Sequence, residues 1–309
     1  FAQQAPIVIK FSHVVAPDTP KGKGAQRFKE LAEERTKGRV KVEIYPNSQL
    51  YKDKEELEAL QLGAVQMLAP SVSKFGPLGV KEFEAFDLPY IFPDKAVLAR
   101  VTEGPIGQGL FKKLEPKGIV GLAYWDNGFK VMTDNKPLRM PEDFKAQKLR
   151  IQSSKVLEAQ MRALGAIPQV MAFSEVYQAL QTGVVDAAEN GVNVFLVNKH
   201  YEVAPVMSMT EHEANNNCIW VSQKTWDSLT DEQKKWVQAA ADEVSKQEPA
   251  KALQLEKDSA VKLQKMGVKV VENVDKSGFA AAAKPIQDQL AKELGPHSVK
   301  ILELVRNVK

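Results

Sequence analysis

The side chain best suited to chemistry in this sequence is Arg150, which lies in the short β-like run 148–152. If this run is a strand, its end places the guanidinium beside Gln152 and Ser153. The guanidinium is a planar fork of donors that matches a carboxylate through two parallel hydrogen bonds. An arginine near a strand end is also commonly a surface charge, so the carboxylate-binding interpretation depends on the residues that accompany Arg150.

The motifs of common catalytic sites are missing from the sequence. It contains no Gly-x-Ser-x-Gly nucleophile elbow and no G-x-x-x-x-G-K-[ST] phosphate loop. His212-Glu213 begins like the zinc motif H-E-x-x-H, but Asn216 stands where the second histidine would be. The four histidines are too dispersed in the sequence to suggest a site. We therefore expect a binding protein rather than an enzyme, with no metal site and no cofactor.

The first seventy residues have the pattern of a parallel α/β sheet. Apolar or alternating runs predict strands at 6–12, 40–45 and 65–70, with helices at 24–37 and 53–63 between them. A β-α-β-α-β order implies parallel pairing with helices on both faces. Sheets of this type bind ligands outside the carboxyl ends of their strands. The residues that follow the strands, from His13 to Lys21 and Ser71, are therefore candidates for a binding site.

The later part of the chain predicts a second domain. Asn127-Gly128 indicates a sharp change of direction, which we interpret as the crossing between domains. A helical pattern from the capping-box start at Thr230 to about Met266 is long enough to span two domains, and Pro249 should kink it. The predicted fold class is α/β, with two domains, mixed sheets flanked by helices and a long domain-spanning helix. The first domain comprises residues 1–127 and about 216–252, the second comprises 128–215 and about 253–309, and the ligand cleft lies between them.

The composition limits the classes of function. A chain of 309 residues with 44% hydrophobic residues can bury a core in each of two domains. The 42 basic and 39 acidic residues give a net charge of +3, which argues against a nucleic-acid partner and permits an anionic small ligand. A single cysteine, Cys218, excludes an intrachain disulfide. No apolar run approaches the roughly 20 residues of a membrane helix, so we expect no direct membrane insertion.

The first residues bear on location. Phe1-Ala2-Gln3-Gln4-Ala5 resembles what remains beside a signal-peptidase cleavage site, where small residues are favoured. The charged and apolar regions of a signal are absent, so an arbitrary start would look the same. The sequence therefore leads us to expect an exported protein whose signal peptide has been removed, with the arbitrary start as the alternative.

Six stretches of the chain carry a family resemblance. They are His13-Val14-Val15 with Thr19 to Gly22, Tyr45 to Leu50, Phe86 to Tyr90, Leu149 to Gln152, Ala172 to Gly183, and Asp186 to Asn190. The block from Phe173 to Asn190 is long and specific. Together these stretches resemble the extracytoplasmic solute-binding subunit of a TRAP transporter, the DctP family. The match covers nearly the whole chain.

The resemblance implies a location, a function and three site residues. It implies a periplasmic protein of two α/β domains that close on an organic acid and deliver it to a membrane permease. Arg150 would bind the ligand carboxylate, Asn190 would face the same ligand, and Phe173 would begin the helix packed beside it. Relatives often carry arginine where this chain has Lys130, and a lysine is a point charge rather than a fork.

The resemblance also indicates a branch of the family. His-Val-Val with Thr-Pro-Lys-Gly is similar to the C4-dicarboxylate branch, whereas the sialic-acid branch has asparagine at the place of Val14. A dianion buried between domains needs more than one cation or many donors, because an unpaired buried charge is costly. Arg150 can bind one carboxylate, and Lys21 and Lys130 are available for the other, although Lys21 could also be a solvated loop residue. The other side chains expected to contribute to the site are His13, Ser71, Trp125, Asn127, Gln152 and Asn190.

The leading hypothesis is a monomer that binds a C4-dicarboxylate such as succinate, fumarate or malate for uptake by a TRAP permease. Another carboxylate, such as a 2-oxo acid or a sugar acid, is the alternative within the same class. An enzyme with a two-domain cleft and a ligand-sensing partner of a membrane receptor are alternatives from other classes. The missing nucleophile–base pair counts against the enzyme.

Overall fold

The structure is a computed structural model, and it describes residues 5–307. One mixed sheet runs through this part of the chain. Within that range its nine strands follow the order β2-β1-β3-β8-β4-β7-β5-β6, and β9 pairs with β8 outside this path. The strands are β1 (Ile7–Ser12), β2 (Val40–Tyr45), β3 (Met67–Leu68), β4 (Ile119–Asp134), β5 (Lys148–Ile151), β6 (Ile167–Val170), β7 (Ala187–Asn190), β8 (Val206–Ser222) and β9 (Lys269–Val271). Phe1 to Gln4, on which the expected export signal depends, lie outside the described residues.

The sheet consists of two parallel groups joined by a long antiparallel pair. In the first group β1 pairs in parallel with β2 and β3, and in the second group β5 pairs in parallel with β6 and β7. Strands β4 and β8 pair along nearly their whole length, and each also pairs with one of the two groups. The parallel pairing that the sequence predicts for the first three strands is therefore confirmed.

Asn127-Gly128 lies inside β4 and not at the end of a strand. The register between β4 and β8 shifts between Asp126 and Phe129, which is the signature of a bulge. Gly128 has φ +87°, a left-handed conformation that favours glycine, and its N–H donates to Asp126 Oδ1 at 2.9 Å. The expected change of direction is thus a bulge in a continuous strand, because β8 keeps pairing with β4 on both sides of it.

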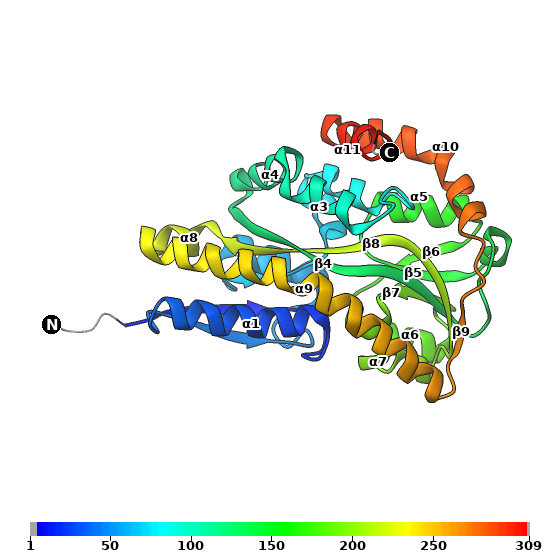
Figure 1. Cartoon of the computed structure of the whole chain (residues 1–309), viewed down its shortest axis with the longest axis horizontal. Helices are drawn as coiled ribbons and strands as arrows, with labels where there is room; N and C mark the ends of the chain where they lie inside the picture. Colours follow the sequence, from blue (N-terminus) through cyan, green and yellow to red (C-terminus); the bar gives the residue numbers. More distant parts are fainter. Residues whose placement is uncertain (1–4, 308–309) are drawn as a thin grey trace.

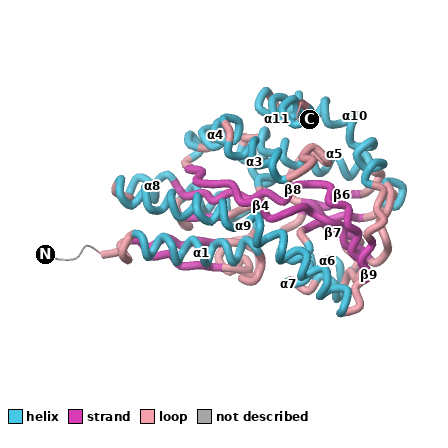
Figure 2. The backbone as a smooth tube through the Cα atoms, viewed as in Figure 1, coloured by secondary structure: helices cyan, strands magenta, loops and turns pink. Residues whose placement is uncertain are grey.

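Helices cover both faces of this sheet (Figures 1 and 2). They are α1 (Pro20–Arg35), α2 (Asp53–Leu62), α3 (Lys95–Glu103), α4 (Pro105–Lys112), α5 (Lys155–Ala163), α6 (Val176–Thr182), α7 (Val192–Val197), α8 (Gln223–Ser228), α9 (Asp231–Lys265), α10 (Lys276–Leu294) and α11 (Pro296–Arg306). Two 3-10 segments, η1 (Val72–Leu78) and η2 (Lys81–Asp87), follow β3, and η5 (Phe173–Glu175) precedes α6. None of the described helices combines the length and the apolarity that a membrane crossing needs.

The long helix α9 packs along both parallel groups. It has 35 residues and begins with the expected capping box, in which Thr230 Oγ1 accepts from Gln233 N at 3.2 Å. It contacts α1 and β4 in one part and α7 and β9 in another. Figure 1 shows a change of direction about midway along the helix, and Pro249 stands near the middle of its sequence. The predicted long, domain-spanning helix is confirmed.

The two C-terminal helices pack on the helices beside the first parallel group. Leu290 of α10 and Ile301 and Leu302 of α11 belong to the same buried cluster as Val97 of α3 and Leu110 of α4. Figure 1 shows α11, in red, next to α3 and α4. The sequence alone placed residues 253–309 in the second domain. This packing leads us to propose that α11 and the end of α10 go with the first domain instead, because their apolar faces are buried there.

Candidate functional site

A cavity is lined by residues from both parallel groups and from the helices beside them. Seven of the ten residues that the sequence proposed for a ligand site line it: Lys21, Ser71, Asn127, Arg150, Gln152, Phe173 and Asn190. Residues as far apart in the sequence as Lys21 and Asn190 therefore meet in one place. The other three, His13, Trp125 and Lys130, lie outside this lining.

The topology explains why these residues meet. Lys21 follows β1, Ser71 follows β3, Arg150 and Gln152 stand at the end of β5, and Asn190 ends β7. These are carboxyl ends of strands, where open α/β sheets hold their ligands. The loop after β1 is fixed by Thr19, whose Oγ1 accepts from Gly22 N at 3.1 Å and so caps α1. The capped turn buries Lys21 beside the cavity.

Protein contacts hold one edge of the Arg150 guanidinium in place. Arg150 Nε and Nη2 donate to the Met171 carbonyl at 3.1 and 3.0 Å, and the guanidinium lies 5.9 Å from the centre of the Phe173 ring. Only 2% of the residue is exposed. Burial lowers the pKa of Arg150, and the charge of Asp53 opposes that effect. The N–H groups of Nη1 have no hydrogen-bond partner among the described residues, so they remain free for a ligand carboxylate.

Lys21 is a cation without a paired anion. It is buried, and within the described chain its ammonium has neither a hydrogen-bond nor an ion-pair partner. Burial, together with the positive charge of Lys74, lowers the pKa of Lys21 to about 7. A carboxylate placed beside it would supply the missing counter-charge and favour the protonated form.

Lys74 and Asp53 line the same cavity and were missed by the sequence analysis. Lys74 Nζ lies 2.7 Å from Asp53 Oδ1 and 3.0 Å from Glu56 Oε1. Burial disfavours the charge of Lys74, but Asp53 and Glu56 outweigh burial and raise its pKa. Asp53 Oδ2 also accepts from Phe173 N at 2.8 Å, which connects α2 to the start of η5. The rule that selected Ser71, a polar residue just past the third strand, would have found Lys74 three residues later.

Two of the three residues outside the lining are buried in other surroundings. Trp125 is in the core of the first parallel group, 6.4 Å from the Phe11 ring, and Gly24 packs against its indole. His13 is buried, and neither ring nitrogen has a hydrogen-bond partner in the described part of the chain. Burial lowers the pKa of His13 to about 3, and Lys21 contributes in the same direction. Neither residue lines the cavity in this structure, and their ligand contacts remain predictions.

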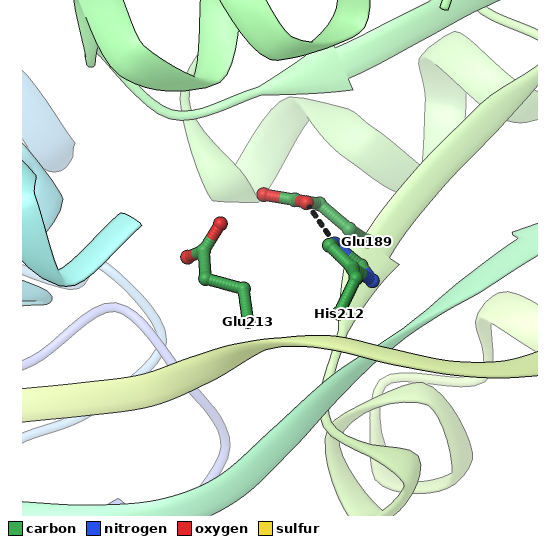
Figure 3. A group of neighbouring side chains, drawn as sticks. All are labelled: Glu189, His212 and Glu213. Atoms are coloured by element: carbon green, nitrogen blue, oxygen red, sulfur yellow. Dashed lines mark hydrogen bonds and ion pairs between the residues drawn. The ribbon is translucent and has the colours of Figure 1, made fainter. Parts of the chain in front are cut away.

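The third residue outside the lining is Lys130, which pairs with the buried Glu189 and Glu213. Figure 3 shows these two carboxylates together with His212. Lys130 Nζ lies 3.1 Å from Glu189 Oε1, contacts Glu213 Oε1 and donates to Gln152 Oε1 at 2.9 Å. His212 Nε2 lies 2.8 Å from Glu189 Oε2. Lys130 is therefore paired with protein carboxylates and does not reach the cavity as a second cation.

The same cluster has the composition of a metal site. One ligand atom each from Glu189, His212 and Glu213 lies within 4.8 Å of the other two. The Lys130 ammonium, however, already pairs with both carboxylates, so a cation is present between them. Burial raises the pKa of Glu213, whereas Lys130 and His212 outweigh burial at Glu189 and lower its pKa. The Lys130 ammonium therefore already supplies a positive charge to both carboxylates, while neither oxygen of Glu213 has a hydrogen-bond partner in the described part of the chain.

Comparisons with known proteins agree with this geometry. The model of the family described as bacterial extracellular solute-binding protein, family 7, matches residues 11–294. The C4-dicarboxylate-binding periplasmic protein DctP of Rhodobacter capsulatus is 54% identical over 301 residues, which cover 95% of this chain and 89% of that protein. The resemblance that the sequence motifs indicated is confirmed.

Solved structures give the same result. A TRAP periplasmic solute-binding protein from Sulfurospirillum deleyianum, with bound succinate, has a TM-score of 0.92 and 41% identity, covering 99% of this chain and 100% of that one. A sugar acid binding protein from Advenella mimigardefordensis, in complex with galactonate, has a TM-score of 0.94 and 29% identity, with 99% and 100% covered. The expected α/β fold class with two domains is thereby confirmed.

Proposed function

The chain belongs to the family of bacterial extracellular solute-binding proteins, family 7, and we propose that its ligand is a C4-dicarboxylate such as succinate, fumarate or malate. The observation that carries the proposal is the presence of Lys21, Lys74 and Arg150 in the lining of one cavity. Lys74 is paired with two carboxylates, but Lys21 and the Nη1 side of Arg150 are not paired within the described chain. A dianion supplies one carboxylate for Lys21 and one for Arg150.

A monocarboxylate would satisfy this cavity less well. Bound at Arg150, it would leave Lys21 buried without an ion-pair partner, which is costly in a site of low dielectric constant. Bound at Lys21, it would leave the Nη1 donors of Arg150 unused, although Arg150 Nη2 keeps Asp53 Oδ1 at 3.9 Å. Lys21 is thus the proposed cation for the second carboxylate, for which the sequence analysis offered both Lys21 and Lys130. The amides of Asn127, Gln152 and Asn190 complete the lining as hydrogen-bonding groups.

We further propose that the protein acts in the periplasm and delivers its ligand to the membrane permease of a TRAP transporter. The family is one of solute-binding proteins, and the names of the relatives describe periplasmic and TRAP proteins. The role needs binding, closure and release, and no chemical conversion. The unpaired donors of the cavity suit binding, since a carboxylate requires hydrogen-bond donors and cations.

A sugar acid is the second candidate ligand, favoured by the relative that binds galactonate. A sugar acid has one carboxylate and several hydroxyl groups, so it would use Arg150 and leave Lys21 without a counter-ion. For that reason the cavity favours the dicarboxylate. The two candidates make different demands on the site and can be separated by one screen.

A thermal-unfolding screen over organic acids tests the function. A ligand that binds only the folded protein raises its stability, by about 2.7 kcal/mol at a concentration one hundred times Kd. We expect succinate, fumarate or malate to give the largest rise in Tm, with galactonate and 2-oxo monoacids well below. A larger rise with galactonate would favour the sugar acid, and no rise with any C4 acid would contradict the proposal. The same mixtures, analysed by NMR, should show each acid unchanged.

A further inference from the structure

The Lys130 ammonium has three polar partners within the described chain. Nζ donates to Gln152 Oε1 at 2.9 Å and to Glu189 Oε1 at 3.1 Å, and it pairs with Glu213 Oε1. The residue is 3% exposed, so water does not compete for these bonds. A lysine ammonium has three N–H donors and no acceptor. Whatever group of Gln152 faces Lys130 must therefore be an acceptor.

This requirement fixes the orientation of the Gln152 amide. Its carbonyl oxygen must face Lys130, because the N–H₂ group can only donate. Gln152 also lines the ligand cavity, so the end of the amide that remains for a ligand is its N–H₂ group. The orientation of a glutamine amide is ordinarily chosen from its neighbours. Here the Lys130 ammonium cannot accept a hydrogen bond, so only one orientation of the Gln152 amide fits.

Two other amides of the lining also have their donors free. Asn190 Oδ1 accepts from Gly191 N at 2.9 Å, which leaves the Asn190 N–H₂ group for other partners. Asn127 Nδ2 is buried and has no hydrogen-bond partner among the described residues. The three amides therefore add donors to the donors of Lys21 and Arg150. Such a lining matches a ligand whose oxygens only accept, as those of a fully ionised dicarboxylate do.

We propose that Lys130 is a positioning residue that selects for acceptor-only ligands by holding the Gln152 carbonyl and turning the Gln152 N–H₂ group to the cavity. The inference rests on the proposed function, since it takes a dicarboxylate to be the ligand. Glu189 of β7 and Glu213 of β8 hold the ammonium in place, and both strands pair with β4, which carries Lys130. The buried cluster thus acts on specificity without touching the ligand.

The test compares succinate with succinamate, in which one carboxylate is replaced by a carboxamide that also donates. Calorimetry gives the ratio of their affinities for wild type, Lys130→Met, Gln152→Met and the double variant. Lys130→Met frees the Gln152 amide to turn its carbonyl towards the carboxamide. We expect this variant to lower the succinate preference by about tenfold, the order of one hydrogen bond to a charged group. Lys130→Arg, which can still donate to Gln152, should retain most of the preference.

The double variant separates positioning from a direct effect of charge. If Lys130 acts through Gln152, Lys130→Met changes the ratio by less than about twofold once Gln152 is already methionine. An equal loss of preference in both backgrounds would show that the lysine charge acts on the ligand across the gap, and it would overturn the proposal. Wild-type protein that binds neither acid would contradict the proposed function itself, which is a different result.

A second variant keeps Lys130 in place, because Lys130→Met leaves Glu189 and Glu213 without their cation and could impair folding. In Gln152→Glu one carboxylate oxygen accepts from Lys130, and the other presents an acceptor to the ligand. We expect this variant to bind succinate more weakly than Gln152→Met does, by about tenfold or more. Circular dichroism confirms that both variants are folded. Succinate affinity of Gln152→Glu equal to that of wild type would show that no Gln152 donor faces the ligand.

Discussion

Arg150 combines a fixed position with free donors. The Met171 carbonyl binds Nε and Nη2, and the Phe173 ring lies against the guanidinium, so little freedom is lost when a ligand arrives. A lysine at this position could reach the carboxylate with its charge. It could not bind Met171 and a carboxylate at the same time in the same geometry, because its ammonium has no fork.

The first prediction is that Arg150→Lys weakens succinate binding by about tenfold to a hundredfold. Hydrogen bonds to charged groups contribute roughly 1.5–3 kcal/mol, and about 1.4 kcal/mol corresponds to one decade in Kd. Calorimetry measures the change, and circular dichroism shows that the variant is folded. Arg150→Ala should weaken binding further, since the ligand carboxylate would then lack its cation. A folded Arg150→Lys protein with wild-type affinity would contradict the assignment of the carboxylate site.

Lys21 makes binding depend on pH near neutrality. In the free protein its pKa is lowered to about 7, chiefly by burial, and a bound carboxylate raises that pKa again. Binding therefore takes up a proton above pH 7. Glu256, in the same lining, has its pKa raised to about 7, chiefly by burial, and its ionisation at higher pH also disfavours an anion. Asp53, Glu56 and Lys74 keep their charges paired with one another.

The second prediction is that the association constant for succinate falls as the pH rises above about 7, by up to about tenfold per pH unit. The sign follows from the proton uptake, since the protonated form of Lys21 binds best. Calorimetry at pH 6, 7, 8 and 9 measures the slope. Lys21→Met should bind more weakly at pH 6 and show a clearly smaller slope, which separates Lys21 from Glu256. An unchanged slope in Lys21→Met would remove Lys21 from the explanation.

The sequence predicts the residues of the site well where they follow strands and poorly where they depend on pairing. Arg150, Ser71 and Asn190 could be chosen because the carboxyl ends of strands form one edge. Lys130 was misplaced because its partners, Glu189 and Glu213, come from neighbouring strands 59 and 83 residues away in the chain. Lys130 and Glu213 are directly paired across β4 and β8, which no local pattern reveals.

At the scale of the elements, a carboxylate from one segment caps a helix from another. Glu84 of η2 accepts through Oε2 from Lys155 N at 2.6 Å and from Val156 N at 3.2 Å, at the start of α5. Ser154 Oγ lies 3.3 Å from the same oxygen. The first N–H groups of a helix have no partner within the helix, and a negative charge there is favourable. This cap connects the chain after β3 to the chain after β5.

The third prediction is that Glu84→Ala lowers the free energy of unfolding by about 1–3 kcal/mol, because buried N–H groups lose their acceptor. Burial and the charge of Asp87 raise the pKa of Glu84 to about 7, which offsets part of the benefit of the charged form. Urea denaturation with an unchanged m-value measures the effect. The matched control is Glu158→Ala in the same helix, whose carboxylate forms surface ion pairs with Lys155 and Arg162. We expect that control to stay within about 0.5 kcal/mol of wild type.

Equal stability losses for Glu84→Ala and Glu158→Ala would contradict the capping role. The sequence does not reveal this cap, because Glu84 and Ser154 are seventy residues apart. By contrast, the local capping box of α9, from Thr230 to Gln233, is readable from four residues and is present. Local hydrogen bonds of this kind are predictable, whereas caps from distant segments depend on the tertiary fold.

At the scale of the whole molecule, contacts cross the predicted domain division beside the cavity. Asp53 accepts from Phe173 N at 2.8 Å, and Lys52 lies 3.2 Å from Glu175. These contacts hold α2 against η5 and partly enclose the cavity, as expected for the closed arrangement. A ligand that contacts Arg150 on one side and Lys21 on the other would stabilise this arrangement. The domain boundaries at 127–128, near 216 and near 252 remain a prediction. We propose only that α11 and the end of α10 belong to the first domain.

The fourth prediction is that the free protein is more open in solution than the complex. Small-angle X-ray scattering should give a smaller radius of gyration with saturating succinate than without ligand, because the two domains rotate together. The control is butyrate at the same concentration, which supplies only one carboxylate. An unchanged radius with saturating succinate would show that the protein does not close by domain rotation.

The central claim is that the cavity binds a dianion through Arg150 and Lys21 together. Calorimetric titration with succinate and with butyrate tests it most directly, since the two acids have the same carbon chain length and differ by one carboxylate. The account predicts that at pH 7 succinate binds at least about a hundredfold more tightly, because the second carboxylate forms hydrogen bonds with a charged group. Equal affinities for succinate and butyrate would contradict it.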